Sequence, residues 1–171
     1  VALGADVEPE AGDDVLDAGG MAVVAGLANG HTHAAMTLMR GYGGDLPLMT
    51  WLQDRIFPIE AKLTADDVYW GTRLACVEMI RSGTVRFWDM YWQPEAVARA
   101  VQDAGVRASV ALPLVDGLDA AKSDALRADA ERSLDALADA GTRITPTLGP
   151  HSIYLVSEKS LHWIAELSSE R

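Results

Sequence analysis

Two histidines separated by one residue, His31 and His33, are the first residues of this sequence whose types and spacing suggest chemistry. On an extended segment, side chains two residues apart point to the same face, so both imidazoles can reach one metal ion. Neutral imidazole suits zinc, and a catalytic zinc takes three protein ligands and a water molecule. The same spacing also arises by chance between unrelated loop histidines, so the pair needs the support of its position in the fold.

A third histidine, His151, follows Gly149 and Pro150, which favour a sharp turn that would present its imidazole. The alternative is a loop histidine that only bonds to backbone groups. The fourth histidine, His162, stands in the middle of a predicted helix beside Trp163. We expect it to be a partly buried helix residue with no role in a site.

Three carboxylates stand at or near the ends of predicted elements. Glu60 follows an apolar run with helical spacing, where a solvated helix-end carboxylate is the ordinary role. Asp89 lies inside an apolar strand pattern, and Asp116 follows another. Each is either a site carboxylate or a turn-forming residue, and we expect the structural role for both.

Alternating strands and helices must position these residues. The run 21–27 predicts a buried strand that ends in a turn at Asn29-Gly30. The pattern predicts further strands over 1–7, 84–90, 106–112 and 143–148, and helices over 46–59, 64–82, 94–105, 120–140 and 157–171. Such alternation is typical of a parallel α/β sheet, in which ligand sites form beyond the carboxyl ends of the strands. Four βα units are half of an eight-stranded barrel, and they also suffice for a small open sheet.

The composition predicts a folded and acidic protein. Hydrophobic residues make up 49% of the 171 residues, and 14 Lys and Arg stand against 25 Asp and Glu, for a net charge of −11. This charge argues against binding to nucleic acid or to an anionic membrane surface. No stretch reaches the roughly 18 uninterrupted apolar residues of a membrane span. The lone Cys76 cannot form an internal disulfide, and we expect a cytoplasmic protein.

Several segments together resemble the amidohydrolase superfamily. Within it they are similar to the branch that holds 5-methylthioadenosine/S-adenosylhomocysteine deaminases and s-triazine chlorohydrolases. The resemblance extends over the whole sequence. The segments that carry it are 26–41 (GLANGHTHAAMTLMRG), 45–52 (DLPLMTWL), 56–60 (IFPIE), 69–72 (YWGT) and 149–152 (GPHS).

The resemblance implies a metal-bearing (β/α)8 TIM-type barrel and a small β-sandwich. Residues 1–20 would form part of the N-terminal β-sandwich, and residues 21–171 would form about the first four βα units of the barrel. The implied cofactor is one divalent metal ion, Zn2+ first and Fe2+ as the alternative. The implied reaction is the hydrolytic deamination of an adenine nucleoside, such as 5-methylthioadenosine or S-adenosylhomocysteine, by metal-bound hydroxide.

By the same resemblance, His31 and His33 would be the first two metal ligands. Glu60 would bind the ribose of the nucleoside, and His151 would contact the substrate. Leu112 stands where some relatives have an arginine for the amino-acid carboxylate of the substrate. This difference favours a substrate without a carboxylate, such as 5-methylthioadenosine.

The later motifs of the family are missing from the sequence. The third histidine ligand, the proton-transferring glutamate and the late aspartate are expected after Arg171. We therefore expect these 171 residues to be an N-terminal part that does not deaminate by itself. The remainder of the chain or a second chain would complete the barrel around the small-molecule substrate, and a homo-oligomer is compatible with this.

Two other functions remain open from the sequence. The first is an s-triazine or guanine-type hydrolase of the same superfamily, which ammonia release on a panel of substrates would distinguish. The second is a small α/β binding module whose histidines are incidental. Metal content discriminates between the hydrolases and the binding module.

Overall fold

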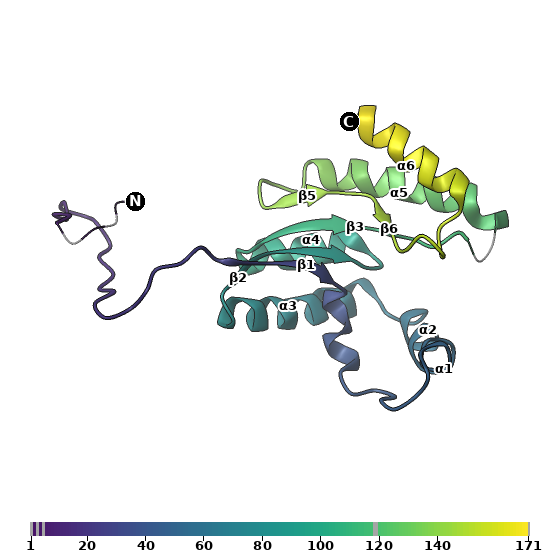
Figure 1. Ribbon diagram of the computed structural model, residues 1–171, viewed down its shortest axis with the longest axis horizontal. Coiled ribbons are helices and arrows are strands. Elements are labelled where there is room, and N and C mark those ends of the chain that lie inside the picture. The colour runs from purple at the N-terminus through teal and green to yellow at the C-terminus, as the bar shows by residue number, and fades with distance from the viewer. Residues whose placement is uncertain (1, 3, 5, 118–119, 171) are drawn as a thin grey trace.

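A computed structural model describes residues 2, 4, 6–117 and 120–170 (Figure 1). Its main sheet has four parallel strands in the order β1-β2-β3-β5, and a separate parallel pair joins β4 to β6. The predicted alternation of strands and helices is therefore confirmed. The strands are β1 (Leu27–Thr32), β2 (Thr84–Met90), β3 (Arg107–Ala111), β4 (Pro113–Leu114), β5 (Ile144–Pro146) and β6 (Gly149–Pro150).

Helices follow every strand of the main sheet, as crossover connections between parallel strands require. After β1 in the sequence, the chain forms the 3-10 helix η1 and then a helical run with a π-helical turn, η2, in its middle. The π-turn ends two residues before Pro58, which has no N–H to donate to the preceding turn. The helices are η1 (Ala34–Met39), α1 (Leu48–Trp51), η2 (Leu52–Ile56), α2 (Phe57–Glu60), α3 (Ala65–Arg81), α4 (Pro94–Ala104), η3 (Ala120–Lys122), α5 (Ser123–Ala138) and α6 (Glu158–Glu170).

The ends of α3 and α4 follow from local sequence signals. Thr64 caps α3: its Oγ1 accepts from the backbone N–H of Asp67, and the Asp67 carboxylate accepts from the Thr64 N–H at 2.8 Å. Pro94 stands in the first turn of α4, and Gly105 ends that helix in the left-handed conformation with φ 78°. These boundaries confirm the sequence prediction for both helices.

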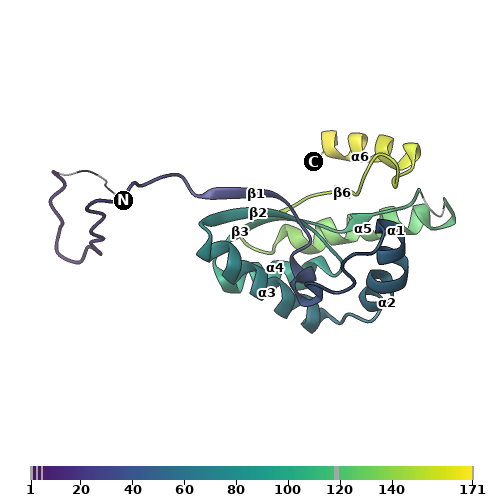
Figure 2. The ribbon, with the colours of Figure 1, turned by 60° about the horizontal axis from the view of Figure 1, so that its bottom comes forward.

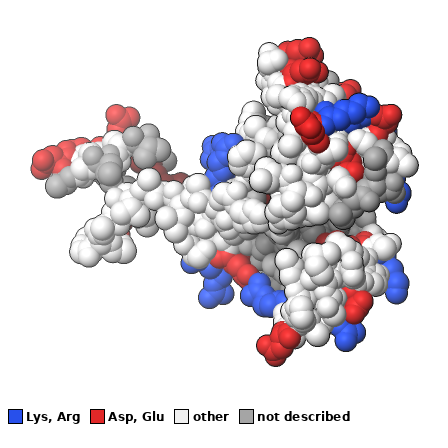
Figure 3. All heavy atoms as spheres, turned by 45° about the vertical axis from the view of Figure 1, so that its right-hand side comes forward, with Lys and Arg blue, Asp and Glu red and all other residues white. Residues whose placement is uncertain are grey.

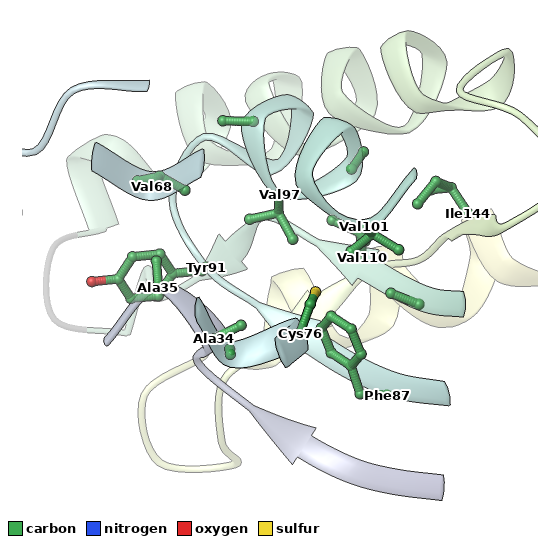
Figure 4. Packing of buried hydrophobic residues seen from close by; sticks show 14 of the residues in the cluster. Ala34, Ala35, Val68, Cys76, Phe87, Tyr91, Val97, Val101, Val110 and Ile144 are labelled. Atoms are coloured by element: carbon green, nitrogen blue, oxygen red, sulfur yellow. The ribbon is translucent and has the colours of Figure 1, made fainter. Parts of the chain in front are cut away.

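The main core lies between one face of the sheet and the helices α3 and α4. Phe87 of β2 and Val110 of β3 are buried there against Cys76 of α3 and Val97 of α4 (Figure 4). Burial raises the pKa of the Cys76 thiol to about 11. A smaller cluster around Leu114 joins α5 to α6. The sheet is therefore fixed from one side by the helices that pack on it.

The strand predicted over 21–27 is wrong in its bounds, and its apolar residues are not buried as predicted. The strand begins at Leu27 rather than Met21, and Met21, Val23 and Val24 are exposed. Pairing with β2 selects residues 27–32, because Leu27 lies opposite Thr84 and Thr32 lies opposite Asp89. Register shifts interrupt the ladder, so the predicted turn at Asn29-Gly30 is an irregular strand segment instead.

The chain before β1 extends away from the sheet (Figures 1 and 2). Of the predicted strand 1–7, the described residues 2, 4, 6 and 7 form no strand, and residues 1, 3 and 5 lie outside the described residues. The assignment of residues 1–20 to a β-sandwich stays a prediction. Over the described part of the chain, no helix has both the length and the apolar character needed to cross a bilayer.

Candidate metal and substrate site

The rings of His31 and His33 lie together at the carboxyl end of β1. Their centroids are 5.0 Å apart and their planes are nearly perpendicular, at 82°. His31 is the next-to-last residue of β1, and its backbone N–H donates to the Asn29 side chain at 3.2 Å. His33 follows the strand directly and precedes η1. The structure thus brings the two predicted ligands to the edge of the sheet where α/β folds bind ligands.

The ring of His33 is held in one orientation by β2. Its Nδ1 lies 2.7 Å from the carbonyl oxygen of Met90. Since a carbonyl oxygen only accepts, Nδ1 must carry the hydrogen, and the lone pair of the neutral ring is then on Nε2. Metal-binding histidines are commonly oriented in this way by a bond from the other ring nitrogen.

The segment around His33 is also tied to the buried side chain of Asp89. Oδ1 of this carboxylate accepts from Thr32 Oγ1 at 2.7 Å and from the backbone N–H of Ala34 at 2.6 Å. Burial raises the pKa of Asp89 to about 6, although both hydrogen bonds and the charge of His33 oppose that shift. The structural role expected for Asp89 is the one that these contacts show.

His151 approaches the pair from the other side of the site. Its ring plane is nearly parallel to that of His33, with centroids 6.2 Å apart. The expected turn at Gly149-Pro150 is the short strand β6, and the backbone N–H of His151 donates to Leu114 O at 3.2 Å. Burial lowers the pKa of His151, and the charges of His33 and His31 lower it further, so the ring is neutral near pH 7.

An open cleft of about 920 Å3 lies beside two of the three histidines, whereas His33 lines a separate cavity of about 550 Å3. His31 and His151 both line it, together with Trp88 and Met90 of β2. Its far wall comes from α5 and α6, through apolar residues such as Leu134 and Ile164. The cleft is large enough for a small organic molecule.

Glu60 lies outside the lining of this cleft. Its carboxylate accepts from the indole N–H of Trp92 at 3.2 Å. Tyr91, which precedes Trp92, is buried with its ring centroid 6.4 Å from that of His33. Burial raises the pKa of the Tyr91 hydroxyl, and the neighbouring Glu60 raises it further. Sequence reasoning missed Tyr91 and Trp92, although they directly follow a strand and so carry the same positional signal as the histidines.

Other candidate residues lie away from the cleft. The side chain of His162 is 75% exposed on α6, 3.7 Å from Glu158, and is not partly buried as expected, because it faces away from α5. Asp116 has the expected structural role: its carboxylate accepts from Ser123, Ser157 and Ser160. Leu112 lines a different cavity, of about 560 Å3, next to α4.

The histidine pair fits a divalent metal ion of the zinc type by its chemistry. Both donors are imidazoles, and the Nε2 lone pair of His33 is not committed to the Met90 carbonyl. Among the described residues, no group of three or more His, Cys, Asp and Glu side chains is placed to hold a metal ion. The described residues thus bring together two imidazoles, fewer than the three protein ligands that a catalytic zinc takes.

Comparison with known proteins identifies the family. Residues 22–171 match the model of the amidohydrolase family. The chain is 47% identical over 162 residues to the 5'-deoxyadenosine deaminase of Methanoregula boonei, and 46% identical over 169 residues to the 5-methylthioadenosine/S-adenosylhomocysteine deaminase of Syntrophomonas wolfei. These matches cover 92% and 98% of this chain but 36% and 39% of the two relatives.

Two solved structures are likewise similar to this chain over part of their own length. An adenosine deaminase from Xanthomonas campestris with bound zinc superposes with a TM-score of 0.74 and 33% identity, covering 85% of this chain and 34% of that one. Atrazine chlorohydrolase TrzN from Arthrobacter aurescens, complexed with zinc, has a TM-score of 0.71, 16% identity and coverage of 85% and 38%, and so shares the fold.

The chain thus spans little more than a third of the length of these relatives. Its four parallel strands correspond to the first part of their TIM-type barrel, which confirms the predicted fold class and decides against a small open sheet. The chain belongs to the amidohydrolase family.

Proposed function

We propose that this chain is the N-terminal part of a zinc-dependent deaminase that acts on adenine nucleosides. The observation that carries the proposal is the convergence of His31, His33 and His151 at one end of the sheet. The names of the two relatives described above, both nucleoside deaminases, support the choice of reaction. The one buried thiol, Cys76, is in keeping with a reducing compartment such as the cytoplasm.

In this proposal, His31 and His33 hold the metal ion. When bound, the metal supplies a water molecule activated near neutral pH and a Lewis acid beside the substrate. The hydrogen bond from His33 Nδ1 to the Met90 carbonyl fixes the ring and leaves Nε2 as the nitrogen that would bind the ion. The remaining ligands come from polypeptide outside the described residues, either the rest of the chain or a second chain.

His151 and Glu60 have binding roles in the proposal. A neutral His151 ring can donate one hydrogen bond and accept another, which suits the ring nitrogens of a purine. Its lowered pKa keeps it neutral near pH 7, where a charged ring would repel the metal ion. Glu60, held by Trp92, offers a carboxylate oxygen to the hydroxyl groups of a ribose.

The cleft favours a nucleoside without a carboxylate. Among the described residues that line it, none is a lysine or an arginine. The amino-acid carboxylate of S-adenosylhomocysteine would then find no cationic partner on this side of the site. We therefore place 5'-deoxyadenosine and 5-methylthioadenosine before S-adenosylhomocysteine as substrates.

A chimeric enzyme tests the proposal. This chain would replace the matching 162 residues of the Methanoregula boonei deaminase, with which it is 47% identical. Ammonia release is measured with zinc on 5'-deoxyadenosine, 5-methylthioadenosine, S-adenosylhomocysteine, guanine and atrazine. We expect turnover of the first two, and loss of at least a thousandfold in kcat/KM on His33→Ala, with His162→Ala as the matched control that changes nothing.

Two results would contradict the proposal. Turnover of guanine alone, or hydrolysis of atrazine with release of chloride, would assign the chain to another hydrolase of the family. A folded chimera that binds no zinc and turns over no substrate would leave the histidines without a catalytic role, as in a binding module.

A further inference from the structure

We propose that Asp89 is a positioning residue that holds His31 and His33 in the geometry needed to bind the metal ion. The inference rests on the metal-binding role proposed above for the histidine pair. Its physical basis is the set of contacts between the end of β2 and the residues that surround His33.

Three consecutive residues of β2 hold the last residue of β1 and the two residues that follow it. The hydroxyl of Thr32 lies 2.9 Å from Trp88 O and 2.7 Å from Asp89 Oδ1. The next residue, His33, donates to the carbonyl of Met90. The backbone N–H of Ala34 then donates to Asp89 Oδ1. Asp89 therefore bonds to both neighbours of His33 at once.

The backbone hydrogen bonds between β1 and β2 do not by themselves fix the segment that carries His31 and His33. Pairing between β1 and β2 is irregular between Asn29 and Thr32, the stretch that contains His31. A segment with an interrupted ladder has fewer backbone bonds to fix its conformation. The carboxylate of Asp89 adds two hydrogen bonds to this segment, one with the Thr32 side chain and one with the Ala34 backbone.

The burial of Asp89 distinguishes a positioning role from general packing. The residue is fully buried, and its Oδ2 has no hydrogen-bond partner among the described residues. A carboxylate with one unsatisfied oxygen is costly to bury, and an apolar side chain would pack there at lower cost. Phe87, two residues earlier, is buried in the core, so Asp89 belongs to the helix-covered face of β2 and does not line the cleft. It therefore acts on the metal through Thr32, His33 and Ala34 and not as a ligand.

The test measures zinc binding and ring tautomers rather than activity. Imidazole 15N signals of the chimeric enzyme described above are recorded by NMR during titration with Zn2+, and the exposed His162 serves as an internal reference for weak, unspecific binding. We expect Asp89→Ala to weaken zinc binding at His31 and His33 about 10- to 100-fold, the usual effect of removing an outer-shell partner. We expect Asp89→Asn, which keeps an acceptor oxygen, to stay within about threefold of the wild type.

A second readout needs no metal. In the wild type the His33 ring should be locked in the tautomer with hydrogen on Nδ1, and in Asp89→Ala it should average between both tautomers. Val97→Ala, a cavity variant in the same core, is the control for lost stability and should change neither readout in the folded fraction. If Asp89→Ala does not fold, Thr32→Val removes one of the two bonds and should weaken zinc binding several-fold.

The outcomes separate the two proposals. If the wild type binds zinc and Asp89→Ala, or its substitute Thr32→Val, binds it equally well with an unchanged tautomer, the positioning role is overturned and the proposed function stands. If zinc binds no better at His31 and His33 than at His162, or if His33→Ala leaves binding intact, the proposed function fails and the positioning role with it.

Discussion

At the scale of single residues, the site depends on how imidazole rings are oriented. The spacing of His31 and His33, together with their position after a predicted strand, predicted that they lie together, because residues two apart share a face of an extended chain. The sequence could not show that Met90 and Asp89 fix this segment. Those bonds join residues more than fifty positions apart, and only the pairing of β1 with β2 brings them together.

The bond between Trp92 and Glu60 gives a prediction at the same scale. In the chimeric enzyme, Trp92→Phe removes the indole N–H that holds the Glu60 carboxylate but keeps an aromatic ring. A hydrogen bond of this kind is worth about 1 kcal/mol, so we expect KM for the nucleoside to rise roughly fivefold with kcat nearly unchanged. Steady-state kinetics measures both constants.

Trp163→Phe is the matched control for that variant. Its indole N–H donates to Glu131 at the same distance of 3.2 Å, between α6 and α5. This variant should leave KM as it is. A Trp92→Phe enzyme with an unchanged KM would show that Trp92 does not position the Glu60 carboxylate for binding, or that Glu60 does not contact the ribose.

At the scale of elements, local signals predicted some boundaries well and others badly. The start of α3 was predictable because Thr64 and Asp67 form a capping box within four residues. The start of β1 was not, because the apolar run from Met21 resembles a strand as closely as the true one does. Pairing with β2 selects the later register, and no local pattern encodes that choice.

The attachment of α6 gives a prediction about pH. Burial alone would raise the pKa of Asp116, but hydrogen bonds from Ser123, Ser160 and Ser157 outweigh burial and lower the pKa. A carboxyl whose pKa is lower in the folded state contributes stability that is complete above its unfolded pKa of about 4 and is lost as the pH falls below it. We expect Asp116→Asn to lower the free energy of unfolding by about 2 kcal/mol at pH 7.

The same variant should also flatten the loss of stability between about pH 5 and pH 3, as followed by urea unfolding at each pH. Asp124→Asn is the control, because the Asp124 carboxylate pairs with Arg127 on the same helix while its own side chain is 84% exposed. It should change stability by less than about 0.5 kcal/mol. An Asp116→Asn protein with the wild-type pH profile would refute this role of the carboxylate.

At the scale of the whole molecule, the described residues leave part of one sheet face and one sheet edge exposed to solvent. Leu27 of β1 is 60% exposed, and Trp88, on the face of β2 opposite Phe87, is about half exposed. Strand β1 is an edge strand of the four-stranded sheet. On the face in Figure 3, basic side chains lie in small groups among acidic ones, and a broad uncharged area lies between them. Such a surface fits a chain that is completed by further polypeptide.

We accordingly expect the 171-residue chain by itself to be inactive and to bind a fluorescent apolar dye strongly. The chimera, whose additional strands would cover the sheet, should bind the dye weakly and release ammonia from 5'-deoxyadenosine. The two proteins are compared at equal concentration with zinc present. Turnover by the isolated chain that disappears in His31→Ala would show that the described residues already hold a complete site.

The account depends most directly on the metal ligands, and a crystal structure of the zinc-loaded chimera tests them. We predict one nitrogen of His31 and Nε2 of His33 at about 2.0–2.1 Å from a single zinc ion, with Nδ1 of His33 still bonded to the Met90 carbonyl. A zinc ion bound elsewhere, or rings of His31 and His33 that point away from it, would contradict the account.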